Sequence, residues 1–377
     1  MKRVRVLHLP ARAPYARHLV SDGIEIVNAQ DNTPPIPRDT TFGWLKNFLE
    51  ANPDNYNAFD VLHIHTVELT DINTFQDVIE GCVHNNKGLL FTFHDTRPMF
   101  SKDIENYNRS LKIIASTNAV LATLTESARQ VLSDITNVSM DKIYVIPHGN
   151  VLPLDSELWN REKPPKESNT TFSIHGGFRP NKSLFPAVLN FAFGMPETEK
   201  LRILTRGIGN KEYFENSDVR ETLRIASTAK NIHVQFHPFP SDEEIAEFVF
   251  NSDYAVLPYL WGAHSGQLEL AFDLGVSVVA TNVGFYEEQC KALKGYGPPP
   301  IFVDWSDGNE YQYGSRILSG MIMAANGDHK FSPEKRKDFF KFRRSEREQI
   351  LEKYEILYHE ALNRFKPKMQ PTPIPEP

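Results

Sequence analysis

The sequence predicts an α/β protein of two doubly wound, Rossmann-like domains that face each other across a cleft. The chain has 377 residues, which is too long for one compact core and suits two domains of ordinary size. Strand-like and helix-like runs alternate along it, as they do in parallel βαβ units. A polar stretch with two prolines, residues 161–170, interrupts this alternation and predicts an interdomain linker.

The first predicted domain covers residues 1–160 and contains six strand-like runs. These runs are largely apolar on both faces, as a parallel sheet between two helical layers requires. Helical patterns at residues 41–49, 74–83 and 126–135 lie between them. The predicted strands span residues 4–9, 24–28, 61–65, 89–94, 119–124 and 143–147.

The second predicted domain covers residues 171–331 and repeats the alternation. Ser241 and Glu244 form a capping-box pattern before "IAEFVF", which predicts a helix start. Residues 332–365 predict one long helix, and the proline-rich residues 366–377 predict a disordered tail. The predicted strands span residues 172–175, 201–205, 233–236, 255–258, 276–281 and 301–303.

Composition excludes several classes of protein. A formal net charge of -7 argues against bulk attraction to nucleic acid, which needs a basic surface. Cys82 and Cys290 form no metal-spaced cluster and indicate reduced thiols. The basic N-terminal run stops at Pro10, and no segment approaches the roughly 20 apolar residues that span a bilayer. We therefore predict a cytoplasmic protein.

A glycine-rich turn, "FSIHGGFRPNKS", opens the second domain. Gly176 and Gly177 allow backbone N–H groups to approach an anion, and Arg179 and Lys182 add two charges in a turn expected to face solvent. The alternative is that both charges are merely solvated around a tight turn. We favour a diphosphate site.

A second anion site is predicted where "HSGQLELAFDLGVSVVAT" begins a helix after a strand. At His264, Ser265 and Gly266 the free N–H groups and the helix dipole favour a phosphate. A nucleoside diphosphate explains two predicted anion sites in one domain better than chance does.

Other cofactor patterns are incomplete. Gly207 and Gly209 lack the third glycine of a nicotinamide fingerprint. No Asp-x-Asp pair is present to anchor a metal–diphosphate complex. His63 and His65 share one strand face, and we favour a core or cleft-lining role because no nearby Cys or carboxylate completes a metal set. The sequence predicts no metal and no cofactor.

These turns resemble the retaining glycosyltransferases of GT-B architecture, in particular family 4, over nearly the whole chain. "FRPNKS" resembles the family's Arg-x-x-Lys turn for the donor diphosphate, and "GVSVVAT" resembles its G-x-P-V-V-A-T strand. "IPHGN" and "FTFHD" resemble two turns of the first half. The resemblance also implies that the C-terminal helix crosses back and packs its phenylalanines on the first domain.

The resemblance implies catalytic roles for Arg179, Lys182 and His94, with His94 pointing across the cleft at the donor sugar. Acceptor binding is expected in the first domain, near Pro14, Tyr15 and His65. The expected donor-binding residues are Gly177, Arg179, Lys182, His264, Ser265, Gly266, Gln267, Leu268 and Glu269.

One departure concerns a pair of glutamates that is common in the family, the second of which bonds the ribose. The expected positions fall on Gly262 and Leu270, and Glu269 is one place out of register. This leaves the ribose contact and the nucleotide base open.

The predicted function is transfer of a sugar from a nucleoside-diphosphate sugar to a hydroxyl acceptor, small or lipid-linked, with retention and without a metal. Two alternatives stay open: an inactive nucleotide-sugar-binding partner protein, supported by the missing glutamate pair, and a nucleotide-sugar epimerase of the same fold. The aromatic, basic stretch from Lys335 to Arg347 also suggests weak peripheral membrane contact as an alternative to packing.

Overall fold

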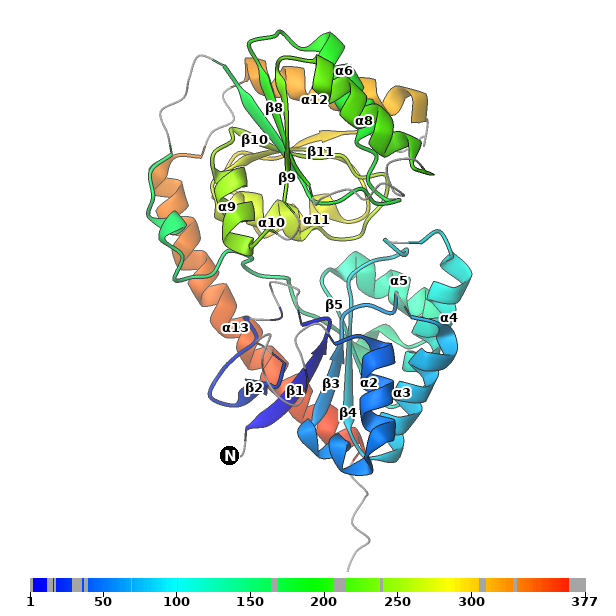
Figure 1. Ribbon diagram of the computed structural model, residues 1–377. Helices are drawn as coiled ribbons and strands as arrows, with labels where there is room; N and C mark the ends of the chain where they lie inside the picture. The colour runs from blue at the N-terminus through cyan, green and yellow to red at the C-terminus, as the bar shows by residue number, and fades with distance from the viewer. Residues whose placement is uncertain are drawn as a thin grey trace, which may run out of the picture. The chain divides into compact units, whose positions relative to one another are not determined.

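The computed structural model describes residues 3–11, 16, 18–28, 36, 40–68, 70–99, 101–163, 169–205, 215–237, 240–304, 310–327 and 331–365. The chain forms two compact units (Figure 1). Unit 1 comprises Met1–His94, Glu105–Ile146 and Ile350–Pro377, and unit 2 comprises Asp95–Ile104 and Pro147–Gln349.

Unit 1 is built on a parallel six-stranded sheet with strand order β2-β1-β3-β4-β5-β6. Its inner strands are buried on both faces; all six residues of β4, for example, are buried. This is the environment that continuous apolar runs predict. The strands are β1 (Val4–Leu9), β2 (Ile24–Ile26), β3 (Val61–Ile64), β4 (Gly88–Phe93), β5 (Val120–Thr123) and β6 (Ile143–Val145).

Helices cover both faces of this sheet. The C-terminal part of α13 (Pro333–Phe365) supplies Tyr354, Leu357 and Tyr358 to a core shared with β1, β3, β4 and β5. The other helices of unit 1 are α2 (Phe42–Ala51), α3 (Ile72–His84), α4 (Ile104–Ala115) and α5 (Glu126–Thr136), with short 3-10 turns η1 (Pro53–Ala58) and η2 (Met140–Lys142).

Unit 2 has a second parallel six-stranded sheet, with strand order β12-β11-β10-β7-β8-β9. Counted from β7, this is the 3-2-1-4-5-6 order of dinucleotide-binding folds. The strands are β7 (Thr171–His175), β8 (Lys200–Thr205), β9 (Ile232–Phe236), β10 (Tyr254–Leu257), β11 (Ser277–Thr281) and β12 (Ile301–Val303).

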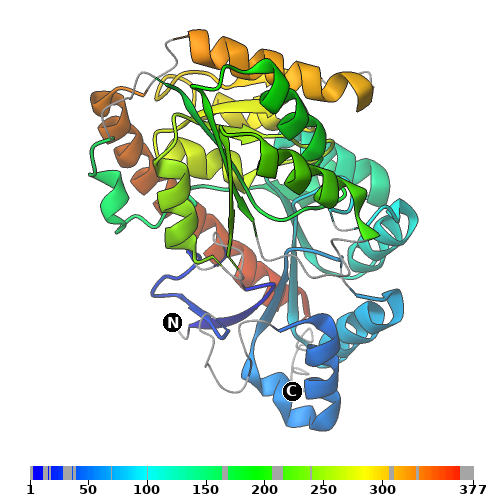
Figure 2. The same ribbon diagram turned by 45° about the horizontal axis from the view of Figure 1, so that its top comes forward.

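The sheet of unit 2 separates two apolar cores (Figures 1 and 2). Alternate residues of β10 face opposite cores: Ala255 and Leu257 face α9 (Asp242–Phe250) and α10 (Gly266–Asp273), while Tyr254 and Val256 face the opposite helical layer. That layer comprises α6 (Phe185–Gly194), α8 (Ser217–Thr228) and α12 (Glu310–Asn326). Unit 2 also contains η3 (Glu157–Trp159) and α11 (Tyr286–Lys291).

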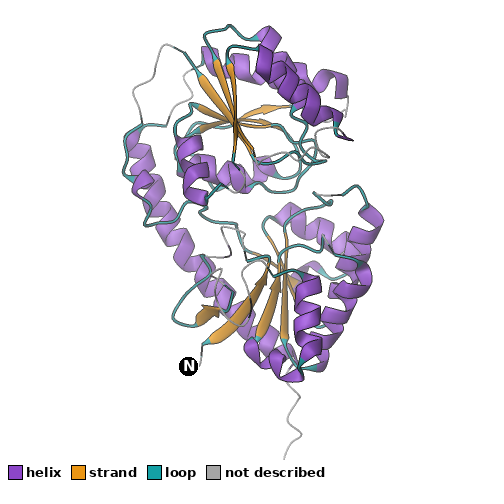
Figure 3. Cartoon of the chain, viewed as in Figure 1, coloured by secondary structure: helices purple, strands orange, loops and turns teal. Residues whose placement is uncertain are grey.

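Side-chain caps fix several helix starts. Ser241 accepts from Glu244 N while the Glu244 carboxylate accepts from Ser241 N, so the predicted capping box is present. Thr41, Asp71 and Thr125 cap α2, α3 and α5 in a similar way. Figure 3 shows that helices and strands alternate in both units, and the predicted fold class of two Rossmann-like domains is confirmed.

The expected packing of the phenylalanines of α13 is wrong. Phe339 is fully buried in a core of unit 2, and Phe340 and Phe342 pack against the same core. The tyrosines further along the helix pack on unit 1 instead. Because one helix contributes to two cores, its aromatic residues divide between them.

The units also differ from the expected boundaries: unit 2 includes residues 147–160, which were predicted to belong to the first domain, and also Asp95–Ile104. A local contact explains the first difference: the Asp273 carboxylate at the end of α10 accepts hydrogen bonds from Val151 N and Leu152 N, at 2.7 and 3.0 Å. Among the described residues, we find no helix that is both long and apolar enough to cross a membrane.

Candidate functional site

The switch point of the sheet in unit 2 lies between β7 and β10, where the strand order reverses. Ligands of open α/β sheets bind beyond the carboxyl ends of strands at this point. The predicted Arg–Lys turn follows β7, and the segment leading to α10 follows β10. The structure therefore brings the two predicted anion sites to the same edge of one sheet.

Lys182 is buried at this edge, with 2% of its surface exposed. Its Nζ donates to His175 O at 2.5 Å and lies 5.3 Å from the centre of the Tyr259 ring. The expectation of a solvent-facing lysine is therefore wrong. The ring and the end of β7 enclose the side chain, and neither feature is visible in the local sequence.

Burial makes the ammonium of Lys182 costly. Burial, together with the nearby positive charge of Arg179, lowers the pKa of this group to about 7. Burial likewise lowers the pKa of His175 to about 3, with added contributions from Lys182 and Arg179. His175 is therefore neutral near pH 7, and a bound anion would stabilise the positive charge of Lys182 and Arg179.

The turn that carries Arg179 and Lys182 is held firmly. Lys182 N donates to Arg179 O at 3.0 Å, which closes the turn. Asn181, only 1% exposed, links it to the segment after β10: Leu260 N donates to Asn181 O, and Asn181 Nδ2 donates to Trp261 O. The half-buried Arg179 therefore stands on a rigid support next to the buried lysine.

Gly176 meets a strict backbone requirement. Its φ of +103° is unfavourable for other residues, and a Cβ there would lie 3.2 Å from Gln267 Nε2. Gln267 donates to His175 O at 3.1 Å, the same carbonyl that Lys182 uses. The half-buried Gly177 follows in the turn. Because Gln267 and Lys182 share this carbonyl, the end of β7 and the first turn of α10 lie together, as both predicted anion sites require.

The N-terminus of α10 is fixed while part of it stays available. Ser265 caps the helix by accepting from Leu268 N, and Ser265 N donates to Gln289 Oε1 at 3.1 Å. Gln289 Nε2 in turn donates to Ser265 O at 2.9 Å. The first N–H groups of a helix have no intrahelical acceptor, and among the described residues no acceptor is found for those of Gly266 and Gln267, which can therefore face a ligand.

Other predicted residues of α10 face inward. Leu268 is fully buried, and the Glu269 carboxylate forms an ion pair with Arg343 of α13. His264 Nε2 lies 3.5 Å from Glu269 Oε1. Burial alone would raise the pKa of Glu269, but the charge of Arg343 and the hydrogen bond of His264 hold it well below its usual range. Leu270, which occupies the family's second glutamate position, is also buried.

Two members of this network were not predicted from the sequence. Arg343, fully buried, also pairs with Asp273 at 2.8 Å and with Glu346 at 2.6 Å. His148 of the "IPHGN" segment stacks on His264, with ring centres 4.8 Å apart. Burial, with the neighbouring His264, lowers the pKa of His148 to about 3. The "IPHGN" segment was noted in the sequence, but the stacking of His148 on His264 was not predicted.

Four predicted residues belong to unit 1. His94 follows β4, with its ring centre 5.6 Å from that of His65. His65 is buried, and its Nε2 lies 2.7 Å from His8 Nδ1. Pro14 and Tyr15 lie outside the described residues.

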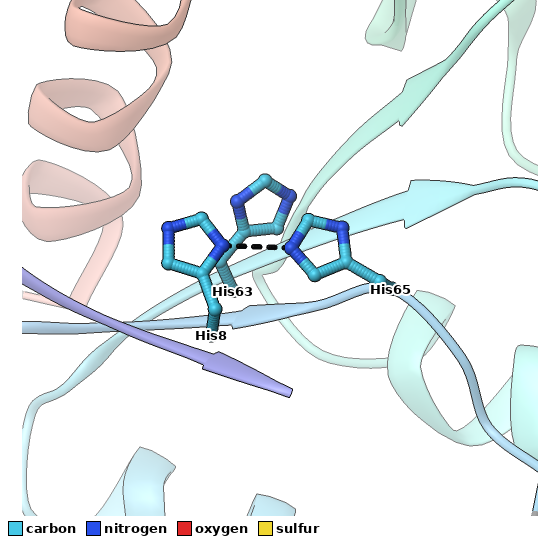
Figure 4. Close-up of side chains that lie close together, drawn as sticks. All are labelled: His8, His63 and His65. Carbon is cyan, nitrogen blue, oxygen red and sulfur yellow. Dashed lines mark hydrogen bonds between the residues drawn. The ribbon is translucent and has the colours of Figure 1, made fainter. Parts of the chain in front are cut away.

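His8 joins His63 and His65 in a compact cluster at the switch point between β1 and β3 (Figure 4). One ring nitrogen from each lies within 4.8 Å of the others. His63 bonds Tyr358 OH through Nδ1 at 2.9 Å and Thr92 Oγ1 through Nε2 at 2.8 Å. The sequence pattern paired only His63 and His65, because His8 is 55 residues from His63 and lies opposite it only through the pairing of β1 with β3.

The two parallel sheets with their helical layers define the GT-B fold, and solved structures share it. Sucrose-phosphate synthase from Thermosynechococcus elongatus matches with a TM-score of 0.60 and 14% identity, covering 96% of this chain and 100% of that one. An α,α-trehalose-phosphate synthase (UDP-forming) from Burkholderia vietnamiensis matches with 0.58 and 11%, covering 96% of both chains. UDP-GlcNAc 2-epimerase from Neisseria meningitidis, bound to UDP-GlcNAc, matches with 0.52 and 13%, covering 91% and 99%.

Sequence comparisons add nothing to this assignment. No family model matches the chain. No curated protein is significantly similar to it. The structural matches establish the fold.

Proposed function

We propose that this protein is a glycosyltransferase that moves a sugar from a nucleoside-diphosphate sugar, with uridine as the base, to a hydroxyl acceptor. The buried ammonium of Lys182 beside Arg179 is the observation that carries the proposal. Among the described residues Lys182 forms no ion pair with a carboxylate, and a bound diphosphate would relieve the cost of burying its charge. Uridine is favoured because the two similar structures named above are a UDP-forming synthase and an epimerase bound to UDP-GlcNAc.

In the proposed mechanism, stabilisation of the leaving group dominates. Negative charge grows on the diphosphate as the sugar departs, and preorganised donors aimed at that charge are usually the largest catalytic contribution. Lys182, Arg179 and the N–H groups of Gly266 and Gln267 would supply these donors without a metal. We propose that the anomeric configuration is retained, because the sequence resembles the retaining enzymes of family 4.

The proposal gives His94 the role of orienting the transferred sugar, and assigns acceptor binding to residues near His65. The acceptor is a hydroxyl compound, small or lipid-linked. Domain closure would exclude water from the reaction and limit hydrolysis of the donor.

The decisive experiment incubates the protein with UDP-, GDP- and dTDP-sugars and follows products by NMR. Slow release of free sugar from one donor, with the anomer observed early, would support a transferase and report its stereochemistry. A new nucleotide sugar formed from donor alone would favour an epimerase. This is the second candidate function because the similar Neisseria structure is a UDP-GlcNAc 2-epimerase. Tight binding without any product would favour an inactive binding protein.

A further inference from the structure

A cluster of three histidines in unit 1 is not used by the proposed donor site. His8 lies on β1, His63 on the neighbouring strand β3 and His65 directly after that strand, and all three are buried, with 0%, 0% and 5% of their surfaces exposed. Their ring centres lie 3.9 to 5.0 Å apart. Such packing concentrates polar nitrogens in a region that excludes water.

We propose that His8, His63 and His65 bind one transition-metal ion, with Zn²⁺ the best fit, and leave a fourth position for water or another oxygen ligand. Three imidazoles with one open position form a ligand set that zinc sites use. The absence of a carboxylate among the three ligands disfavours Mg²⁺ and Ca²⁺, which prefer oxygen.

The geometry is close to what the ion requires. Zn–N bonds of about 2.0–2.1 Å in a tetrahedron place ligand nitrogens about 3.3 Å apart. His8 Nδ1 and His65 Nε2 lie 2.7 Å apart and face each other (Figure 4), and the third nitrogen lies within 4.8 Å. Shifts of about 1.5 Å or less, within reach of side-chain rotation, would complete the site.

The hydrogen bonds around the rings also fit a ligand role. His63 has a hydroxyl partner at each nitrogen, Tyr358 and Thr92, so one can yield to the metal while the other keeps the ring oriented. The backbone of His8 is anchored by the fully buried Asn28, which accepts from His8 N at 3.1 Å and donates to His8 O at 2.9 Å. The ligands are thus supported by their surroundings.

A structural polar cluster is the competing explanation, and the contact between His8 Nδ1 and His65 Nε2 would then be a hydrogen bond. Neutral imidazole donates from one nitrogen and accepts at the other. His8 Nε2 is buried and has no hydrogen-bond partner among the described residues. In the proposed site His8 Nδ1 faces the ion, so the unpartnered Nε2 does not distinguish the two explanations, and metal titration decides between them.

Cobalt substitution tests the proposal directly. The full-length protein is stripped with a chelator and titrated with Co²⁺, whose visible d–d bands are intense in four-coordinate sites. We expect one equivalent to bind with intense bands, Zn²⁺ to displace it, and X-ray absorption of the zinc form to count three imidazoles. Wild-type protein that shows no such bands, or no stoichiometric Zn²⁺ binding, would overturn the proposal without any variant.

Variants locate the ion. His8→Ala should bind Co²⁺ at least about a hundredfold more weakly and lose the rise in melting temperature that Zn²⁺ gives the wild type. His84→Ala removes an exposed histidine of the same unit and should behave as the wild type does. Equal binding by wild type and a folded His8→Ala would place the metal elsewhere and refute the assignment. Since Zn²⁺ binding is measured without donor or acceptor, its outcome is independent of the proposed transferase activity.

Discussion

Replacing Lys182 by Met removes the buried charge at the proposed donor site and keeps most of the apolar stem. Charge-assisted hydrogen bonds to an anion contribute about 1.5–3 kcal/mol each, so UDP should bind about 10 to 100 times more weakly. Isothermal titration at pH 7 measures this loss. Lys353→Met, the same substitution at an exposed position of α13, should leave UDP affinity unchanged.

The same substitution should not destabilise the fold. Burial lowers the pKa of Lys182 from 10.5 to about 7, which corresponds to a cost of ~3–5 kcal/mol at neutral pH for placing this group in the interior. The lost hydrogen bond to His175 O offsets only about 1 kcal/mol of that. We expect the free energy of unfolding in urea to rise by about 2–4 kcal/mol.

These two measurements together separate a binding lysine from a structural one. Weaker UDP binding combined with equal or greater stability is the expected pattern for a residue kept for its ligand. If Lys182→Met binds UDP like the wild type and unfolds more easily, the lysine is structural and the donor site is misplaced.

Four further predictions concern the same chain. Because the unfolded state binds more protons than the folded state between pH 7 and 10.5, wild-type stability relative to Lys182→Met should rise with pH across that window in urea titrations; a flat difference would contradict the lowered pKa. His94→Ala should reduce kcat at least about a hundredfold with little change in UDP affinity; the reverse pattern would remove His94 from the reacting sugar. EDTA should leave UDP affinity unchanged in calorimetry, and a loss that Mg²⁺ restores would show that the protein's own charges do not suffice. Arg343→Met should cost about 3–5 kcal/mol in urea unfolding by stranding buried carboxylates, whereas the exposed neighbour Arg344→Met should cost almost nothing; equal effects would mean that the ion network is unimportant.

Local sequence patterns were sufficient to predict most of the fold. Runs of apolar, often β-branched residues predict the strands, because a parallel sheet buries both faces. The capping box at Ser241 marks the start of α9 because its hydrogen bonds span only three residues. The turn carrying Arg179 and Lys182 was placed correctly after β7 for the same reason: strand, turn and helix follow directly along the chain.

Contacts between distant residues account for what the sequence did not predict. Lys182 is buried by Tyr259 and by the carbonyl of His175 that it shares with Gln267, and these partners come together only when β7 and β10 pair. His8 meets His63 through the register of β1 and β3. Arg343 reaches Asp273 across 70 residues. No local pattern encodes such distances.

The ion network and the proposed donor site are connected through a single helix. Glu269 and Asp273 hold the buried side of α10 on Arg343, and the bonds of Gln289 with Ser265 fix its first turn. These interactions all lie on the inward side, so they position the N–H groups of Gly266 and Gln267 without occupying them. Donors that are already oriented lose little conformational freedom when an anion binds, and they need not reorganise as its charge grows. The costly burial of charge behind α10 therefore has a physical rationale: it provides rigidity at the point where the proposed chemistry needs fixed dipoles.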